Sequence, residues 1–199
     1  MDIDPQSLSP SDAYDFVVSL VIPRPIALIT TTSPEGVPNA APFSFFNAVA
    51  TNPPHVVFSS DRWKGKKKGT IINIEASKEF VVNIVDEALA DGMARTADTH
   101  PPGTNKIEAA GLNIKPAKTV GTPRIAEAPV ALECRLVSLQ LLDEAAVDLV
   151  IGRVENFYIR DDLVKNGKVD PKDLHAIGGI GLSNYVTTRD IFNIPNTGS

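Results

Sequence analysis

The chain has 199 residues, of which 43% are hydrophobic, and it carries a formal net charge of -5 with a sequence pI near 5.2. This length suffices for one well-buried core, so we expect residues 1–199 to form a single domain. The acidic balance excludes a general nucleic-acid binder, because such proteins carry a basic face that neutralises phosphates. The chain lacks an apolar run of transmembrane length and begins with acidic residues at 1–5, so we expect no membrane segment, no secretory signal and a cytoplasmic location.

A single cysteine and three scattered histidines limit the thiol and metal chemistry that the chain could perform. Cys134 cannot form an intrachain disulfide, and a zinc site would need several clustered ligands. The segment 130–137 around Cys134 alternates between apolar and polar residues as a strand does. We therefore expect a packed core thiol at this position and no metal site.

The predicted elements are mostly strands, with a few helices among them. In chain order they are a helix at 11–18, two buried strands at 23–31 and 52–60 that bracket a polar-aromatic bend at 39–47, a helix from the capping Thr70 to about Ser77, a strand at 79–85, helices at 86–95 and 106–111, and two long strands at 130–142 and 147–159. A Pro34-Glu35-Gly36 turn reverses the chain after the first strand, and Asp143-Glu144 turns the long hairpin. Strands without a strict alternation with helices favour an antiparallel barrel with attached helices over a doubly wound nucleotide fold.

Several shorter segments are predicted to be loops or turns. The stretch 97–105 is too rich in Pro and Gly to be regular, and Gly178-Gly179-Ile180-Gly181 lacks the strand and helix context of a dinucleotide site, so we interpret it as a flexible turn. The acidic pairs at 161–162 and 170–173 indicate solvated turns and a helix start. No histidine is placed beside a nucleophilic serine, so no Ser/His/Asp triad is predicted.

The bend at 39–47 combines small polar side chains with a cluster of phenylalanines. Ser44 and Asn47 stand among Phe43, Phe45 and Phe46, and the following strand ends in two further serines at 59–60. One interpretation is a strand with one buried aromatic face. Hydroxyls and amides beside flat apolar walls also suit a neutral, planar ligand with a polar tail, and we favour this second interpretation.

The concentrated positive charge of the chain lies between Arg62 and Lys68, where four lysines follow Arg62. By charge patterning alone this run is a solvated loop. However, Lys68-Gly69-Thr70 stands at the predicted start of a helix, where an ammonium, a hydroxyl and free backbone N–H groups together form a phosphate site.

The order of these segments, from the strand at 23–31 through the bend and the second strand to Lys68-Gly69-Thr70, resembles the flavin reductase-like family. Its members, among them flavoredoxin and the flavin reductase components of two-component monooxygenases, bind FMN in a split β-barrel. The resemblance spans about 19–185 and leaves 186–199 as a tail. Many members have an acidic residue where this chain has Gly69, and this departure lets Lys67 or Lys66 stand in for Lys68.

The resemblance implies roles for particular residues at an FMN site. The bend would line the isoalloxazine and ribityl chain through Ser44, Phe45, Phe46, Asn47 and Ala48, while Ser59 and Ser60 would reach the ribityl hydroxyls or phosphate. Lys68 and Thr70 would hold the phosphate, for which Arg24 and Arg62 are further candidates. Arg24 also has a plainer interpretation, an ion pair with a carboxylate such as Asp15.

His100 and Tyr185 are candidates for contact with the substrate, because the family places a loop and a tyrosine near these positions close to the flavin. Without the resemblance, each would be an ordinary loop or packing residue. The flavin itself carries the redox chemistry in such proteins, so no side chain is assigned a catalytic role.

The resemblance implies an NAD(P)H-dependent flavin reductase or related oxidoreductase with a flavin or small-molecule acceptor, and a monooxygenase as a candidate partner. Two alternatives remain open. One is an FMN-binding electron carrier or flavin store without its own NAD(P)H reductase activity, and the other is an oxidase of the pyridoxamine-phosphate oxidase type. A homodimer is expected, because the long strands and the tail residues Ile191, Phe192 and Ile194 present more apolar surface than one chain can cover.

Overall fold

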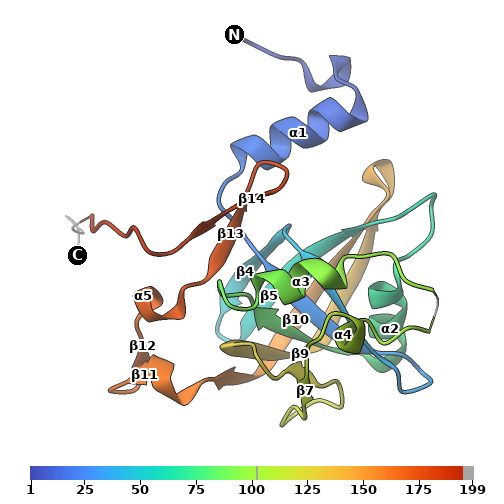
Figure 1. Cartoon of the computed structure of the whole chain (residues 1–199). Helices are drawn as coiled ribbons and strands as arrows, with labels where there is room; N and C mark the ends of the chain where they lie inside the picture. Colours follow the sequence, from blue (N-terminus) through green and yellow to red (C-terminus); the bar gives the residue numbers. More distant parts are fainter. Residues whose placement is uncertain (102, 195–199) are drawn as a thin grey trace.

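The structure is a computed structural model that describes residues 1–101 and 103–194. A seven-stranded antiparallel sheet forms the body of the protein (Figure 1). Pro102 of the predicted loop and residues 195–199 of the predicted tail lie outside the described residues. The strands follow the order β3-β2-β6-β9-β10-β5-β4 across the sheet. Their bounds are β2 (Ala27–Thr32), β3 (Pro38–Phe43), β4 (Phe46–Thr51), β5 (Pro54–Asp61), β6 (Glu79–Ile84), β9 (Val130–Leu142) and β10 (Val147–Ile159).

The sheet curls around its own interior. Phe43 lies on β3, the first strand of the sheet order, and Phe58 lies on β5, the last strand but one, yet their ring centroids are 4.8 Å apart. Phe80 of β6 packs edge-on against Phe58 at 5.6 Å. The helix α2 (Gly69–Ser77) adds Ile71 and Ile74 to the same core. The expected mainly β barrel with attached helices is therefore present.

The long hairpin formed by β9 and β10 confirms the two predicted strands at their predicted bounds, joined by a 3-10 turn at Asp143–Ala145. Cys134 is fully buried in β9 as the sequence predicts, and burial raises the pKa of its thiol. Gly152 of β10 faces Phe80 so closely that an added Cβ would lie 2.3 Å from Phe80 Cζ. The interior thus requires a residue without a side chain at this point of the strand.

A second core lies on the outer face of β2 and β3, beneath two short helices, α3 (Ala90–Thr96) and α4 (Lys106–Ala109). The predicted helix at 86–95 is wrong in its first turn. Asp86 forms a β-bridge with Ala176, and its carboxylate accepts a hydrogen bond from Leu89 N at 2.9 Å, so the regular helix begins only at Ala90.

A small sheet of three strands stands beside the barrel: β1 (Arg24–Pro25), β13 (Ile177–Ile180) and β14 (Asn184–Thr187). The prediction of a flexible turn at 178–181 is wrong for its first three residues, which form β13. A Cβ on Gly178 would lie 2.9 Å from that of Pro23, and one on Gly179 would lie 3.2 Å from the guanidinium of Arg24. These glycines therefore serve close strand packing.

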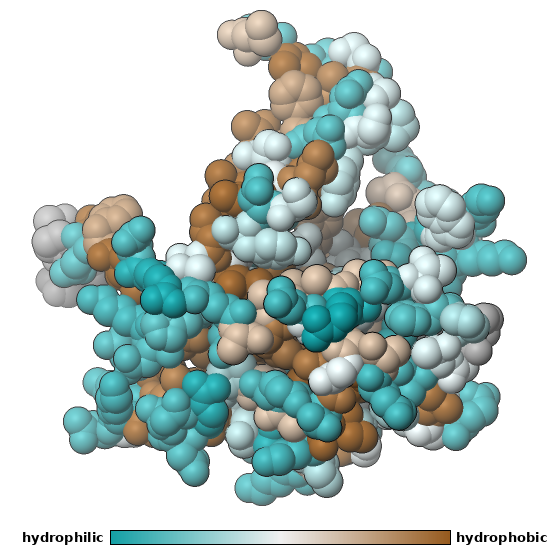
Figure 2. Space-filling view, viewed as in Figure 1, coloured by the Kyte–Doolittle hydropathy of each residue, from teal (hydrophilic) through white to brown (hydrophobic). Residues whose placement is uncertain are grey.

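The helix α1 (Pro10–Leu20) projects from the barrel at the top of Figure 1. It confirms the helix predicted at 11–18 and extends it at both ends. Ser9 caps it by accepting a hydrogen bond from Asp12 N at 3.2 Å. Val18 is its one buried residue. Figure 2 shows hydrophobic side chains along this projecting arm, and Leu20 is 73% exposed.

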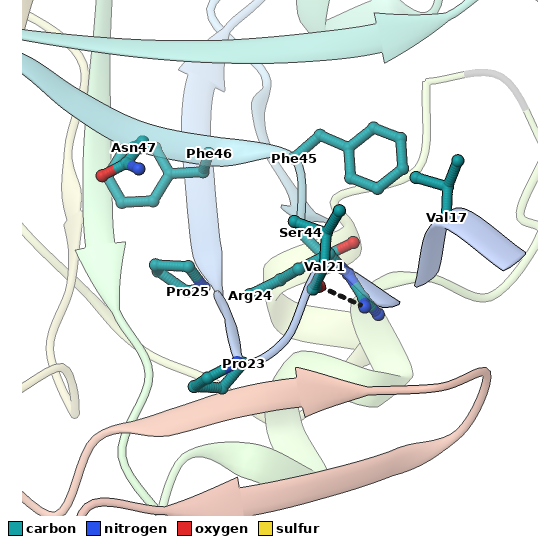
Figure 3. A pocket seen from close by; sticks show the side chains of 9 residues that line it. All are labelled: Val17, Val21, Pro23, Arg24, Pro25, Ser44, Phe45, Phe46 and Asn47. Atoms are coloured by element: carbon teal, nitrogen blue, oxygen red, sulfur yellow. Dashed lines mark hydrogen bonds between the residues drawn. The ribbon is translucent and has the colours of Figure 1, made fainter. Parts of the chain in front are cut away.

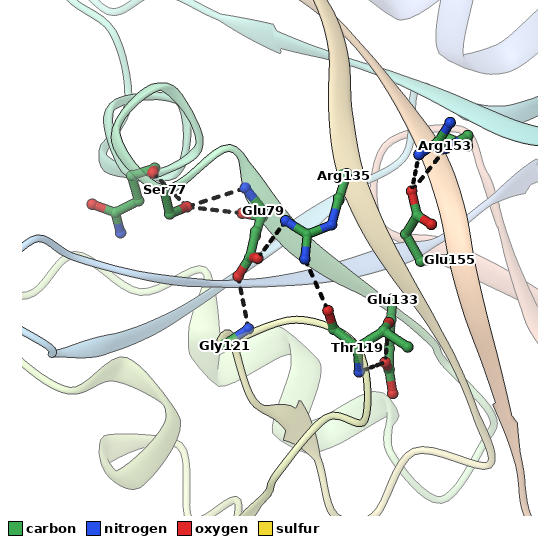
Figure 4. Close-up of polar contacts among 9 residues, drawn as sticks. Ser77, Glu79, Thr119, Gly121, Glu133, Arg135, Arg153 and Glu155 are labelled. Carbon is green, nitrogen blue, oxygen red and sulfur yellow. Dashed lines mark hydrogen bonds and ion pairs between the residues drawn. The ribbon is translucent and has the colours of Figure 1, made fainter.

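Polar contacts hold the loop at 116–122 against the sheet (Figure 4). Glu133 of β9 accepts hydrogen bonds from Lys118 N at 2.9 Å and from Thr119 N at 2.7 Å. Glu79 of β6 accepts one from Gly121 N at 2.7 Å and pairs with Arg135 at 2.9 Å. Burial alone would raise the pKa of Glu133, but these hydrogen bonds outweigh it and hold that pKa below its ordinary value.

The remaining elements are short. They are the strands β7 (Ile114–Lys115), β8 (Arg124–Ile125), β11 (Val164–Lys165) and β12 (Lys168–Val169), the helix α5 (Pro171–Leu174), and 3-10 turns at Pro5–Ser7 and Asp161–Leu163. Asp170 caps α5, which confirms the predicted helix start. Within the described residues, no helix has the length and apolar content needed to cross a membrane.

Candidate functional site

The predicted bend at 39–47 is wrong for most of its length, because 39–43 belong to β3 and 46–47 to β4, which leaves only Ser44 and Phe45 between the strands. Two adjoining pockets meet at this short bend. The first has a volume of about 330 Å³ and is mostly apolar (Figure 3). Its walls come from α1, from the segment around β1 and from the bend: Val17, Val21, Pro23, Arg24, Pro25, Ser44, Phe45, Phe46 and Asn47. In Figure 3 the ring of Phe45 points toward Val17 of α1. The projecting helix therefore forms one wall of this pocket.

The second pocket, of about 100 Å³, is smaller and more polar. It shares Ser44 and Phe45 with the first pocket and is completed by residues of α1, β3, β5 and the start of α2: Tyr14, Pro42, Phe43, Ser59, Asp61 and Lys68. Lys68 Nζ lies 5.9 Å from the centroid of the Phe43 ring. An ammonium and two serine hydroxyls thus lie next to the apolar pocket.

The structure brings together most of the residues that were predicted to bind the cofactor. The walls of the two pockets contain Arg24, Ser44, Phe45, Phe46, Asn47, Ser59 and Lys68. The other four predicted residues, Ala48, Ser60, Arg62 and Thr70, do not belong to these walls. Among them, Ala48 follows the bend on the exposed strand β4, and its N–H donates to Asn47 Oδ1 at 2.8 Å.

Arg24 is buried, and its guanidinium binds backbone carbonyls. It donates to the carbonyl oxygens of Val18 and Val21 at the end of α1 and to that of Gly181 at 2.9 Å. The alternative that Arg24 pairs with Asp15 is therefore wrong. These contacts tie α1 to the turn after β13, while Arg24 Nε is buried without a hydrogen-bond partner among the described residues.

The start of α2 differs from the prediction. Lys68 is the N-cap residue, and among the described residues no side chain caps the helix. Thr70 lies within the first turn, 2% exposed, and its Oγ1 accepts a hydrogen bond from Asn39 of β3 at 3.4 Å. The predicted capping role of Thr70 is wrong because the helix begins one residue earlier, which turns this side chain toward the sheet. Lys68 remains exposed at the pocket.

Two other predicted residues are engaged or enclosed. Arg62 forms a paired contact with the buried Asp148 of β10, at 2.6 and 2.9 Å, and this hydrogen bonding raises the pKa of Arg62. Ser60 is 1% exposed, and its Oγ lacks a partner within the described part of the chain. Neither side chain is free to reach a ligand in the two pockets without rearrangement.

His100 and Tyr185 lie outside both pockets. His100 is half-buried in the loop before α4, with an unpartnered Nε2 among the described residues. Tyr185 of β14 lines a separate groove of about 890 Å³, which adjoins the apolar pocket through Pro23 and Pro25. A molecule in this groove would therefore approach the first pocket from the side of β1.

Sequence reasoning missed the contribution of α1. Tyr14, Val17 and Val21 line the two pockets, although the sequence placed only a helix in this region. The sequence does carry a signal for this contribution, because residues 14–22 are rich in large apolar side chains. In the fold, six of these side chains remain substantially exposed. Exposed apolar side chains gathered on one element indicate a contact surface.

Comparison with known proteins identifies the family. The model of the flavin reductase like domain matches residues 19–173, and the chain belongs to this family. YwrF of Bacillus subtilis is 39% identical over 193 residues, which cover 94% of each chain. A protein of Halalkalibacterium halodurans is 35% identical over 199 residues, 98% of this chain and 95% of its own.

Solved structures agree with the sequence comparison. Nitrilotriacetate monooxygenase component B from Bacillus cereus has a TM-score of 0.93 and 34% identity, with 98% of both chains covered. The 2-nitrobenzoate 2-nitroreductase NbaA of Pseudomonas fluorescens has a TM-score of 0.90 and 32% identity, covering 100% of this chain and 98% of its own. Flavoredoxin of Desulfovibrio vulgaris, at 17% identity and a TM-score of 0.80, shares the fold. The expected split β-barrel of the flavin reductase-like family is confirmed.

Proposed function

We propose that the protein binds FMN and uses NAD(P)H to reduce a flavin or another small acceptor. The observation that carries the proposal is the pair of adjoining pockets at the bend, one apolar and one polar, which share Ser44 and Phe45. A flat ring system fits against Phe45 and Phe46, while a phosphate fits beside Lys68. Membership of the flavin reductase-like family supports the same assignment.

The residues present fit such a cofactor. Ser44 and Ser59 supply hydroxyl groups along the polar pocket, and Asn47 supplies an amide at the apolar one. When bound, the flavin supplies the acceptance of a hydride and its onward transfer as electrons. The chain itself binds, orients and shields that group, so we assign no acid or base to any side chain.

We further propose that the working form is a homodimer. Apolar side chains stand exposed on α1 and along the second half of β9, where Val137 is 55% and Leu142 is 46% exposed. The tail adds Phe192, which is 82% exposed. Monomeric proteins seldom expose so many large apolar side chains, and a second copy would cover them. Because α1 lines both pockets, such a contact would also enclose the flavin site.

The acceptor is the open part of this proposal. Nitrilotriacetate monooxygenase component B and the nitroreductase NbaA are similar in sequence and fold, so reduced flavin handed to a monooxygenase and a nitroaromatic compound are both candidates. The reductase is favoured over an electron carrier because both of these relatives are named for reductive or oxygenase-linked reactions.

The experiment is an anaerobic absorbance measurement on the FMN-loaded protein. We expect one equivalent of NADH or NADPH to bleach the flavin band, and 2-nitrobenzoate added afterwards to restore it. Bound flavin that neither nucleotide bleaches would contradict the reductase and would favour the electron carrier. Protein that retains no FMN at all would contradict the flavin site itself.

A further inference from the structure

The segment between β5 and α2 (Figure 1) contains a tight turn at 63–66, which we call the tryptophan turn. Trp63 N donates to Lys66 O at 3.1 Å, and Lys66 N donates back to Trp63 O at 3.0 Å. Lys64 and Gly65 have φ values of 50° and 74°, the left-handed pair of a type I′ hairpin turn. Trp63 is therefore held on an ordered turn.

Trp63 is the only tryptophan of the chain and is 74% exposed. Lys64 Nζ lies 5.8 Å from the centroid of its ring. An indole in this position contributes nothing to the core. A large aromatic face open to water, with a cation beside it, is the kind of surface on which nucleotide bases stack.

Three lysines of this region form no ion pair among the described residues. Arg62 is paired with Asp148, and Lys67 is paired with Glu75. Within the described residues, no ion pair engages Lys64, Lys66 or Lys68. Three cations without an ion-pair partner in the described part of the chain, gathered around one turn, favour an anionic ligand such as a phosphate.

The turn continues directly from the wall of the polar pocket. Asp61 and Lys68, which flank the turn in sequence, both line that pocket. The Asp61 carboxylate shares this pocket with Lys68 and can accept hydrogen bonds from ribose hydroxyls, so a phosphate would lie on the Lys68 side of the pocket. A ligand with one phosphate at Lys68 and a further nucleoside beyond it would extend toward Trp63.

We propose that the tryptophan turn binds the adenosine-phosphate half of a dinucleotide whose other half occupies the flavin site. This inference rests on the proposed function, because it uses the flavin site as its anchor. Two dinucleotides share the required chemistry: FAD, with its flavin in the site, and NAD(P)H, with its nicotinamide against the flavin. In both, the adenine stacks on Trp63 and the diphosphate meets the lysines.

The shared chemistry is tested with ADP, titrated into the FMN-loaded protein by calorimetry and followed by the fluorescence of Trp63. We expect saturable binding in roughly the millimolar range, because one stacked base and one or two phosphate contacts correspond to about that affinity. Lys64→Gln should weaken this binding. ADP that neither binds nor alters the fluorescence would overturn the inference.

The variant Trp63→Ala distinguishes FAD from NAD(P)H as the dinucleotide that binds. Phe157→Ala is the control for the loss of an exposed aromatic ring, because Phe157 is 52% exposed and far from the turn in sequence. If FAD is the ligand, wild-type protein binds FAD roughly fivefold or more tightly than FMN, and Trp63→Ala removes that difference. If NAD(P)H is the ligand, Trp63→Ala raises its half-saturating concentration by a similar factor. Both results support the inference.

The inference is overturned if Trp63→Ala changes neither quantity, or if it alters only the oligomeric state in sedimentation. The FMN affinity of the wild-type protein is read separately in the same experiments. Absence of FMN binding would refute the proposed function, whereas intact FMN binding with no effect of Trp63→Ala would refute this inference alone.

Discussion

Replacing Lys68 by alanine should weaken FMN binding while leaving riboflavin binding unchanged. Lys68 is exposed, lines the polar pocket and forms no ion pair among the described residues, so its ammonium is available to a phosphate. Riboflavin has the same ring and ribityl chain but no phosphate. The ratio of the two affinities therefore isolates the contact made by Lys68.

The expected loss of FMN affinity in Lys68→Ala follows from the exposure of the Lys68 side chain. A hydrogen bond to a charged group contributes about 1.5–3 kcal/mol, and exposure to solvent places Lys68 at the lower end of that range. A loss of about 1.5 kcal/mol corresponds to a roughly tenfold weaker Kd for FMN. Lys67→Ala is the matched control, because Lys67 is already paired with Glu75.

Thr70→Val must be measured separately from Lys68→Ala. Thr70 is buried and its hydroxyl contacts Asn39, so we expect its loss to lower the melting temperature rather than to act mainly on FMN affinity. Flavin titrations by fluorescence quenching, with thermal unfolding alongside, separate the two effects. Unchanged FMN affinity in Lys68→Ala would refute the phosphate assignment and would direct attention to Lys66 or Arg24.

Three further predictions concern the fold and the assembly. The pKa of Glu133 is lowered in the folded state, so the contribution of this carboxylate to stability is full at neutral pH and is lost as the pH falls through that pKa. In urea unfolding at pH 7, Glu133→Gln should therefore be about 1–3 kcal/mol less stable than the wild type, and the difference should shrink in acid. A difference that stays constant with pH would contradict the assignment. Gly152→Ala should destabilise the protein by about 1–3 kcal/mol because the added Cβ would overlap Phe80, whereas Gly69→Ala should leave the stability nearly unchanged because no atom lies within 4 Å of its added Cβ. Equal unfolding midpoints for the two variants would show that the barrel relaxes around the methyl group. Leu20→Asp should shift the protein toward monomers in sedimentation without lowering the melting temperature of the monomer, and an unaltered dimer would exclude this part of α1 from the contact.

Much of the fold could be predicted from the sequence because the relevant signals are local. The alternation of apolar residues located both long strands at their observed bounds, and the Asp143-Glu144 turn marked the hairpin between them. The predictions failed where a contact distant in sequence prevailed. Asp86 reads as the first turn of a helix, but its bridge to Ala176 keeps it out of α3.

For the site, the sequence by itself determined which chemical groups are available: the serine, amides and phenylalanines at 39–47, the serines at 59–60 and the lysines before α2. Only the tertiary structure decided which of these face one space. It placed Lys68 at the pocket but turned Thr70 toward Asn39, engaged Arg62 with Asp148, and added Tyr14 and Val17 of α1 to the walls. The physical reason is that curling the sheet brings its distant strands together, and no local pattern encodes which side chains then share a cavity.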